Sequence, residues 1–119
     1  MPVKVLVVDD EPMVLRATTA LLQQDGFDVT AAASADDVPL AEQFTVGVFD
    51  LNLGSADGVG LAQTLLDSRR IQEAVFFSGG GQAAAEARAA EVGTVVLKPR
   101  LMPLRDTVRR LSSRPPRQE

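Results

Sequence analysis

The chain has 119 residues, about the size of one domain, and its 45% hydrophobic and 24% charged residues are typical of a soluble globular protein. Its 12 basic residues against 16 acidic ones give a formal net charge of −4, which argues against a surface that binds nucleic acid backbones. The absence of cysteine and histidine excludes disulfides, thiolate or imidazole metal sites, Ser-His-Asp triads and a phosphohistidine on this chain.

Strands and helices are predicted to alternate along the chain. Val3–Val8 is almost continuously apolar and β-branched, which is typical of a strand buried on both faces of a parallel sheet. This run is too short to span a membrane, and acidic residues follow it where an export signal would have a cleavage site. Apolar residues from Met13 to Leu22 then predict a helix that ends before Gly26. The later predicted elements are an extended Asp28–Ala33, a helix Ala35–Gln43, a strand Thr45–Phe49, a helix Val59–Ser68, a strand Ala74–Phe77, a helix Gln82–Val92, a strand Thr94–Leu97 and a last helix with Pro103 in its first turn.

Five β-α units joined by short links predict a single α/β domain, a doubly wound parallel sheet covered by helices on both faces. The second predicted helix should be short or start near Asp37, because Pro39 has no backbone N–H to donate. Residues 1–112 are predicted to form this domain. Residues 113–119 include Pro115 and Pro116 and no apolar residue, which predicts a flexible tail or a truncated linker.

Polar side chains follow four of the five predicted strands. Asp9 and Asp10 follow the first strand, Asp50 the third, Ser78 the fourth and Lys98 the fifth. Ligands of open α/β sheets bind at this carboxyl edge. Carboxylates on adjacent strands there repel one another by up to about 4 kcal/mol per pair, so a divalent cation with oxygen ligands is expected, and Mg²⁺ suits such a site. Carboxylate, metal, hydroxyl and ammonium together are typical of phosphoryl transfer.

Four motifs that occur in order at these strand ends resemble the receiver domains of two-component response regulators. The resemblance extends over about residues 3–112, and it implies a flavodoxin-like five-stranded sheet with the strand order 2-1-3-4-5. It also implies that the Lys98-Pro99 peptide bond is cis. The motifs are Val5–Pro12 for the first strand and its acidic pair, Val48–Leu53 with Asp57-Gly58 for the phosphoacceptor strand and loop, Phe76–Gly79 for the hydroxyl-bearing strand, and Leu97–Pro99 for the lysine–proline step.

The resemblance implies a cytoplasmic signalling switch rather than an enzyme with an outside substrate. Asp50 would accept a phosphoryl group from a sensor histidine kinase or a histidine phosphotransfer protein, and the protein would catalyse only its own phosphorylation and dephosphorylation. An unknown downstream protein would read the switch, and neither nucleic acid nor a membrane is an expected partner of this domain. The other implied roles are metal ligands for Mg²⁺ or Mn²⁺ (Asp9, Asp10, Asp50 and the backbone carbonyl of Asn52), phosphoryl-binding or switch residues (Ser78 and Lys98) and loop residues (Gly79 and Pro99).

Several positions have a simpler interpretation or depart from the family pattern. Glu11 is predicted to be a first-turn acid of the first helix rather than a metal ligand. Val95 stands three residues before Lys98, where the family commonly has an aromatic residue that takes part in the switch. Gly79–Gly81 predicts a mobile loop beside the site and a relatively rapid loss of the phosphoryl group.

Two other functions are compatible with parts of the sequence. A degenerate receiver would act only as a protein-docking module. A phosphohydrolase of the haloacid dehalogenase type would use Asp9 as its nucleophile, but that family has Asp-x-Asp-x-Thr/Val at the first strand, and this chain has Asp9-Asp10-Glu11-Pro12. The sequence therefore favours the phosphorylated receiver.

Overall fold

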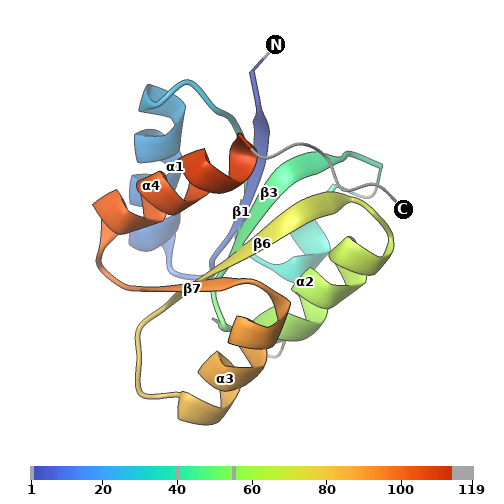
Figure 1. Ribbon diagram of the computed structural model, residues 1–119, viewed down its shortest axis with the longest axis vertical. Coiled ribbons are helices and arrows are strands. Elements are labelled where there is room, and N and C mark those ends of the chain that lie inside the picture. The colour runs from blue at the N-terminus through green and yellow to red at the C-terminus, as the bar shows by residue number, and fades with distance from the viewer. Residues whose placement is uncertain (1, 40, 55, 114–119) are drawn as a thin grey trace.

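The computed structural model describes residues 2–39, 41–54 and 56–113. Its elements follow one another as β1 (Lys4–Val8), α1 (Pro12–Gln24), β2 (Asp28–Ala32), a 3-10 turn η1 (Ala35–Asp37), β3 (Phe44–Phe49), β4 (Asn52–Leu53), β5 (Ala56–Asp57), α2 (Gly58–Asp67), β6 (Ile71–Ser78), α3 (Ala83–Val92), β7 (Thr94–Leu97) and α4 (Leu101–Ser112). Five parallel strands form one sheet in the order β2-β1-β3-β6-β7. Counted within that sheet, the order is 2-1-3-4-5, which confirms the expected doubly wound fold (Figure 1).

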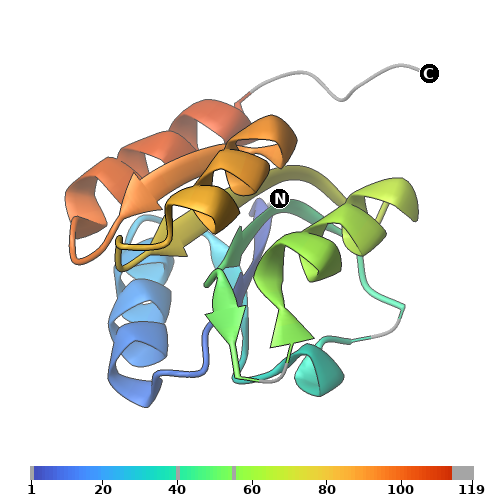
Figure 2. The ribbon, with the colours of Figure 1, turned by 90° about the horizontal axis from the view of Figure 1, so that it is seen from below.

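The sheet lies between two pairs of helices, and each of its faces has its own core. Alternate residues of the strands point to opposite faces, so neighbours such as Val48 and Phe49 belong to different apolar clusters. Helices α1 and α4 cover one face, and α2 and α3 cover the other (Figures 1 and 2). Because both faces are covered, the central strands are buried over most of their length, as their apolar sequences predicted.

The helix predicted over Ala35–Gln43 is wrong. The described residues of this segment contain only the 3-10 turn η1, which ends at Asp37. Val38 has extended backbone angles, φ −70° and ψ 126°, as expected for a residue that precedes a proline. Its side chain is buried in the core on the α2 and α3 side, so the extended segment contributes packing that a helix was expected to provide.

Other boundaries differ by small amounts from those predicted. Strand β6 begins at Ile71, three residues before the predicted start. Helix α4 begins at Leu101, so Pro103 lies in its first turn, as predicted. The hairpin of β4 and β5 was not predicted.

The predicted tail falls almost entirely on residues 114–119, outside the described residues, so the division at residue 112 stays a prediction. Across the described part of the chain, the structure contains no helix with the length and apolar character that crossing a membrane requires.

An ion pair between the end of α1 and α4 makes stability depend on pH. The Arg109 guanidinium donates hydrogen bonds to the Asp25 carboxylate. These bonds, partly opposed by burial and aided by the charges of Arg109 and Arg105, hold the pKa of Asp25 below its usual value of 3.8. A lowered folded-state pKa means that the ionised carboxylate stabilises the protein above the unfolded-state pKa, and that this contribution is lost as the pH falls through the folded-state pKa.

Asp25→Asn is therefore expected to lower the free energy of unfolding at neutral pH. The difference from the wild type should shrink as the pH falls below the ordinary carboxylate range, because protonation then weakens the same ion pair in the wild type. Urea denaturation of both proteins between neutral and acidic pH measures this difference. A difference that stays constant over the whole range would contradict the assignment.

Candidate functional site

The carboxyl edge of the sheet brings the predicted strand-end residues together. Val8 of β1 pairs with Phe49 of β3, so the next residues, Asp9 and Asp50, lie side by side at the ends of the two strands. The Asp50 N–H donates to the Val8 carbonyl at 3.0 Å, which ties the two strand ends to each other. On the far side of β6, Ser78 pairs with Leu97 of β7, and Lys98 is the next residue.

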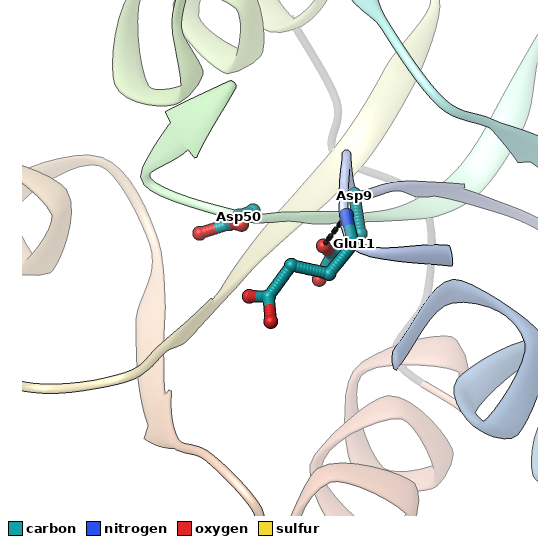
Figure 3. A group of neighbouring side chains, drawn as sticks. All are labelled: Asp9, Glu11 and Asp50. Atoms are coloured by element: carbon teal, nitrogen blue, oxygen red, sulfur yellow. Dashed lines mark hydrogen bonds between the residues drawn. The ribbon is translucent and has the colours of Figure 1, made fainter. Parts of the chain in front are cut away.

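Three carboxylates converge in front of β1 and β3. Asp9, Glu11 and Asp50 each offer an oxygen, and these oxygens all lie within 4.8 Å of one another (Figure 3). Asp9 and Asp50 are only 3% and 6% exposed, whereas Glu11 is exposed. Two backbone N–H groups orient the buried pair: that of Glu11 donates to Asp9 Oδ1 at 2.9 Å, and that of Asn52 donates to Asp50 Oδ1 at 3.2 Å.

Lys98 is the counterion of this acidic cluster. Its side chain is 12% exposed, and its Nζ lies 2.9 Å from Glu11 Oε1, 3.1 Å from Asp9 Oδ2 and 3.2 Å from Asp50 Oδ2. Burial by itself would lower the pKa of Lys98, but its hydrogen bonds to Glu11 and Asp9 and the nearby charges raise that pKa above its ordinary value. The ammonium is therefore charged throughout the physiological pH range.

The surroundings of Asp50 disfavour its ionised form. Burial is the largest cause that raises its pKa, and the negative charge of Asp9 adds to the effect. The N–H of Asn52 and the Lys98 ammonium act in the opposite direction without cancelling it. Additional positive charge at this position, such as a divalent cation, would therefore stabilise the Asp50 carboxylate.

The structure changes the role assigned to Glu11 and leaves Asp10 apart. Glu11 was predicted to be a first-turn acid, but it occupies the N-cap of α1 without a side-chain capping hydrogen bond, and its carboxylate joins the acidic cluster. Asp10 is exposed and lies outside the group of three carboxylates. Its carboxylate faces the loop after β4, because a Cβ at Gly54 would lie 3.9 Å from Asp10 Oδ2. The predicted metal role of Asp10 stays a prediction.

The remaining predicted residues lie just after the carboxyl ends of β3, β6 and β7. Asn52 is an exposed residue at the start of β4. The predicted role of its backbone carbonyl as a metal ligand stays a prediction. The Lys98-Pro99 peptide bond is cis, as the resemblance implied. Gly79 opens the loop after β6, where a Cβ would meet no atom within 4 Å.

Ser78 has a partner that the sequence did not reveal. The residue is 0% exposed, and its Oγ donates a hydrogen bond to Glu86 Oε2 at 3.0 Å. The same oxygen accepts from the Gly80 N–H at 3.2 Å. Glu86 lies in the first turn of an alanine-rich helix, and no motif marked it as part of the site.

The donor set fits a hard divalent cation. Mg²⁺ and Mn²⁺ bind carboxylate and carbonyl oxygens, and the three clustered carboxylates supply oxygens of that kind at suitable mutual distances. Their combined negative charge exceeds the single positive charge of Lys98. The cluster can therefore hold a metal ion, with Asp9, Glu11 and Asp50 as the candidate ligands.

Fold and site together define a doubly wound α/β domain with an acidic, lysine-containing pocket at the carboxyl edge of its sheet. The family model of the response regulator receiver domain matches residues 5–109. No curated protein matches the chain. The chain belongs to the response regulator receiver domain family.

Solved structures of receiver domains have the same fold. A CheY-like receiver domain protein from Methanospirillum hungatei JF-1 is 21% identical with a TM-score of 0.84, over 94% of each chain. The BeF3-activated receiver domain of DrrB, a Thermotoga maritima protein, is 25% identical with a TM-score of 0.84, over 96% of this chain and 100% of that one. TrrA of Thermotoga maritima, in complex with Mg²⁺-BeF, is 17% identical with a TM-score of 0.80, over 93% and 99%.

Proposed function

We propose that this receiver domain is a phosphorylated switch in which Asp50 accepts the phosphoryl group in a Mg²⁺-dependent reaction. The observation that carries the proposal is the buried Asp50 carboxylate, which lies 3.2 Å from the Lys98 ammonium inside a cluster of three carboxylates. Receiver domains are signalling modules that interact with histidine kinases and downstream effectors. The proposed donor is therefore a sensor histidine kinase or a histidine phosphotransfer protein, and the proposed location is the cytoplasm.

The chemistry is a transfer of one phosphoryl group to a carboxylate. An Asp50 carboxylate oxygen attacks phosphorus, the bond from phosphorus to the donor imidazole nitrogen breaks, and an acyl phosphate forms while the donor keeps the electron pair of that bond. A bound Mg²⁺ would neutralise charge on the phosphoryl oxygens and on the carboxylates. The BeF-bound structures of DrrB and TrrA support such a site in similar folds.

Lys98 and Ser78 are proposed to bind the transferred group. Lys98 is already within hydrogen-bond distance of Asp50 Oδ2, so its ammonium is placed to contact a phosphoryl group attached to that residue. Ser78 ends the neighbouring strand β6 and offers a hydroxyl donor. Asp10 and the carbonyl of Asn52 complete the proposed metal ligands together with Asp9 and Asp50. Glu11 is the addition that the structure makes to this proposed set.

The proposal predicts that Asp50→Asn abolishes phosphorylation by acetyl phosphate. Intact mass is measured for the wild type and the variant with Mg²⁺ and with a chelator, and only the wild type with Mg²⁺ should gain one phosphoryl group. Asp57→Asn is the matched control, because Asp57 lies at the end of β5, seven residues after Asp50, and its side chain caps α2 and pairs with the exposed Arg88. That control should be phosphorylated like the wild type.

Two results would contradict the assignment. Equal phosphorylation of Asp50→Asn would place the phosphoryl group elsewhere on the chain. A wild type that takes no phosphoryl group from acetyl phosphate or from a phosphorylated phosphotransfer protein would favour the docking module instead.

A further inference from the structure

The Ser78 hydroxyl already donates its hydrogen bond to a residue of α3. Phe76 and Ser78 lie two residues apart on β6, so their side chains point to the same face of the sheet, and Phe76 belongs to the core beneath α2 and α3. On that face, Ser78 Oγ donates to Glu86 Oε2 at 3.0 Å, and its lone pair accepts from the Gly80 N–H. A serine hydroxyl has one hydrogen to donate, so this contact uses its whole donor capacity.

Glu86 is well placed to hold this hydrogen and to release it. Its N–H donates to the Gln82 carbonyl at 2.8 Å in the first turn of α3, so the carboxylate is anchored to the start of that helix. Ser78 is fully buried, whereas Glu86 is only partly buried. A charged acceptor makes the hydrogen bond stronger than one between neutral groups, and a partly exposed carboxylate can be hydrated again when the bond breaks.

We propose that Glu86 is a positioning residue that keeps the Ser78 hydroxyl on α3 until a phosphoryl group on Asp50 competes for it. This inference rests on the proposed function of Asp50 and Ser78. The Glu86 carboxylate and the phosphoryl oxygens are both anionic acceptors, and the one Ser78 hydrogen can serve only one of them fully. Binding of the phosphoryl group therefore exchanges the acceptor and frees the first turn of α3.

The same contact supplies a path from the site to α3 that needs no aromatic residue on β7. Val95 is partly buried against the core on the α2 and α3 side, and its side chain has no group that can hydrogen-bond to Ser78. Gly80 and Gly81 have positive φ values of 86° and 76° in the loop that joins Ser78 to α3. Glycine adopts this backbone region readily, which gives the loop freedom to follow the exchanged hydrogen bond.

The test is the affinity of the protein for beryllofluoride in the presence of Mg²⁺, followed by ¹⁹F NMR of the bound fluorides. Glu86→Ala removes the competing acceptor and is expected to tighten binding on the order of tenfold. Glu86→Gln keeps an uncharged oxygen acceptor and should give an intermediate affinity. Glu91→Ala is the matched control, because Glu91 is exposed on the same helix, and it should bind within about twofold of the wild type.

A double-mutant cycle separates this role from a general effect on α3. In the Ser78→Ala background, Glu86→Ala should leave the affinity unchanged, because the hydroxyl for which the two acceptors compete is gone. Hydrogen exchange adds a readout without ligand: the backbone amides in the first turn of α3 should exchange faster in Glu86→Ala than in the wild type or Glu91→Ala.

The outcomes distinguish this inference from the proposed function. If the wild type binds beryllofluoride and Glu86→Ala binds it equally well, the positioning role of Glu86 is overturned and the proposed function stands. Tighter binding by Glu86→Ala that persists in the Ser78→Ala background also overturns it. If the wild type binds no beryllofluoride, the proposed function fails and this inference fails with it.

Discussion

Lys98→Met is expected to destabilise the metal-free protein by about 3 kcal/mol, because removal of one partner from a buried ionic group leaves its opposite charges uncompensated. Here one ammonium contacts three carboxylates, and two of those belong to Asp9 and Asp50, which are almost fully buried. Urea denaturation in the presence of a chelator measures the loss. Phosphorylation of Asp50 should also fall strongly in this variant, because the positive group nearest to the acceptor is gone.

The matched control for this prediction is Lys4→Met. Lys4 also pairs with a carboxylate, that of Glu42 at 2.9 Å, but both side chains are more than two fifths exposed. An exposed pair of this kind contributes below about 1 kcal/mol. A loss in Lys98→Met no larger than that in Lys4→Met would contradict the role of Lys98 as the counterion of the cluster.

Magnesium should recover much of the stability lost in Lys98→Met. A ligand that binds only the folded state stabilises it by mass action, and a divalent cation is the remaining source of positive charge for the three carboxylates. Millimolar Mg²⁺ is therefore expected to raise the free energy of unfolding more in the variant than in the wild type.

Gly58→Ala is expected to cost about 3 kcal/mol, because overpacking against backbone atoms cannot be relieved by a side-chain rotation. A Cβ at Gly58 would lie 2.0 Å from the Asp50 carbonyl oxygen and 3.1 Å from the Leu51 Cα. The start of α2 and the segment after β3 would have to separate. Phosphorylation by acetyl phosphate should fall together with stability, because that segment carries Asp50.

Gly60→Ala provides the comparison on the same helix. The atoms nearest to its Cβ would belong to the Asp57 side chain, at 3.4 Å and beyond, which is an ordinary contact. Alanine in place of glycine in a helix stabilises by up to about 1 kcal/mol. Thermal unfolding of the two variants should therefore shift in opposite directions. Equal stability of Gly58→Ala and Gly60→Ala would show that α2 and the Asp50 segment are not in close contact.

The sheet could be predicted because its signals are local. Strands such as Val3–Val8 and Thr45–Phe49 are short, β-branched and apolar. The segments between the strands have apolar residues at helical spacing, so the order of strands and helices follows from periodicity. The polar residues that end these strands then lie at one edge for topological reasons. This logic predicted that Asp9, Asp50 and Lys98 lie near one another, and the structure confirms it.

The wrong helix over Ala35–Gln43 shows where local signals fail. Its composition permits a helix, but Pro39 requires an extended Val38, and the side chain of Val38 is buried in the core. The proline was recognised in the sequence as an obstacle. Val38 can pack in the core because its segment crosses one face of the sheet. The spacing of apolar residues in the sequence does not show which face that is.

Glu11 and Glu86 were missed for a related reason. Each lies in or beside the first turn of a helix, where an acidic residue is common and needs no further explanation. Their roles depend on where the side chain reaches after the chain turns, which for Glu11 is Lys98, 87 residues away. For Glu86 the partner is Ser78, across a loop of glycines. Such directions are set by tertiary structure and leave no pattern in a single sequence.

The central claim, that Asp50 carries the phosphoryl group, is tested most directly by locating that group chemically. Borohydride reduces an acyl phosphate to an alcohol, so a phosphorylated aspartate becomes homoserine. After treatment of the wild type with acetyl phosphate and Mg²⁺, peptide mapping by mass spectrometry should find homoserine at position 50 and intact aspartate at positions 9 and 10. Homoserine at position 9 or 10, or an intact Asp50 in protein that has gained one phosphoryl group, would contradict the account.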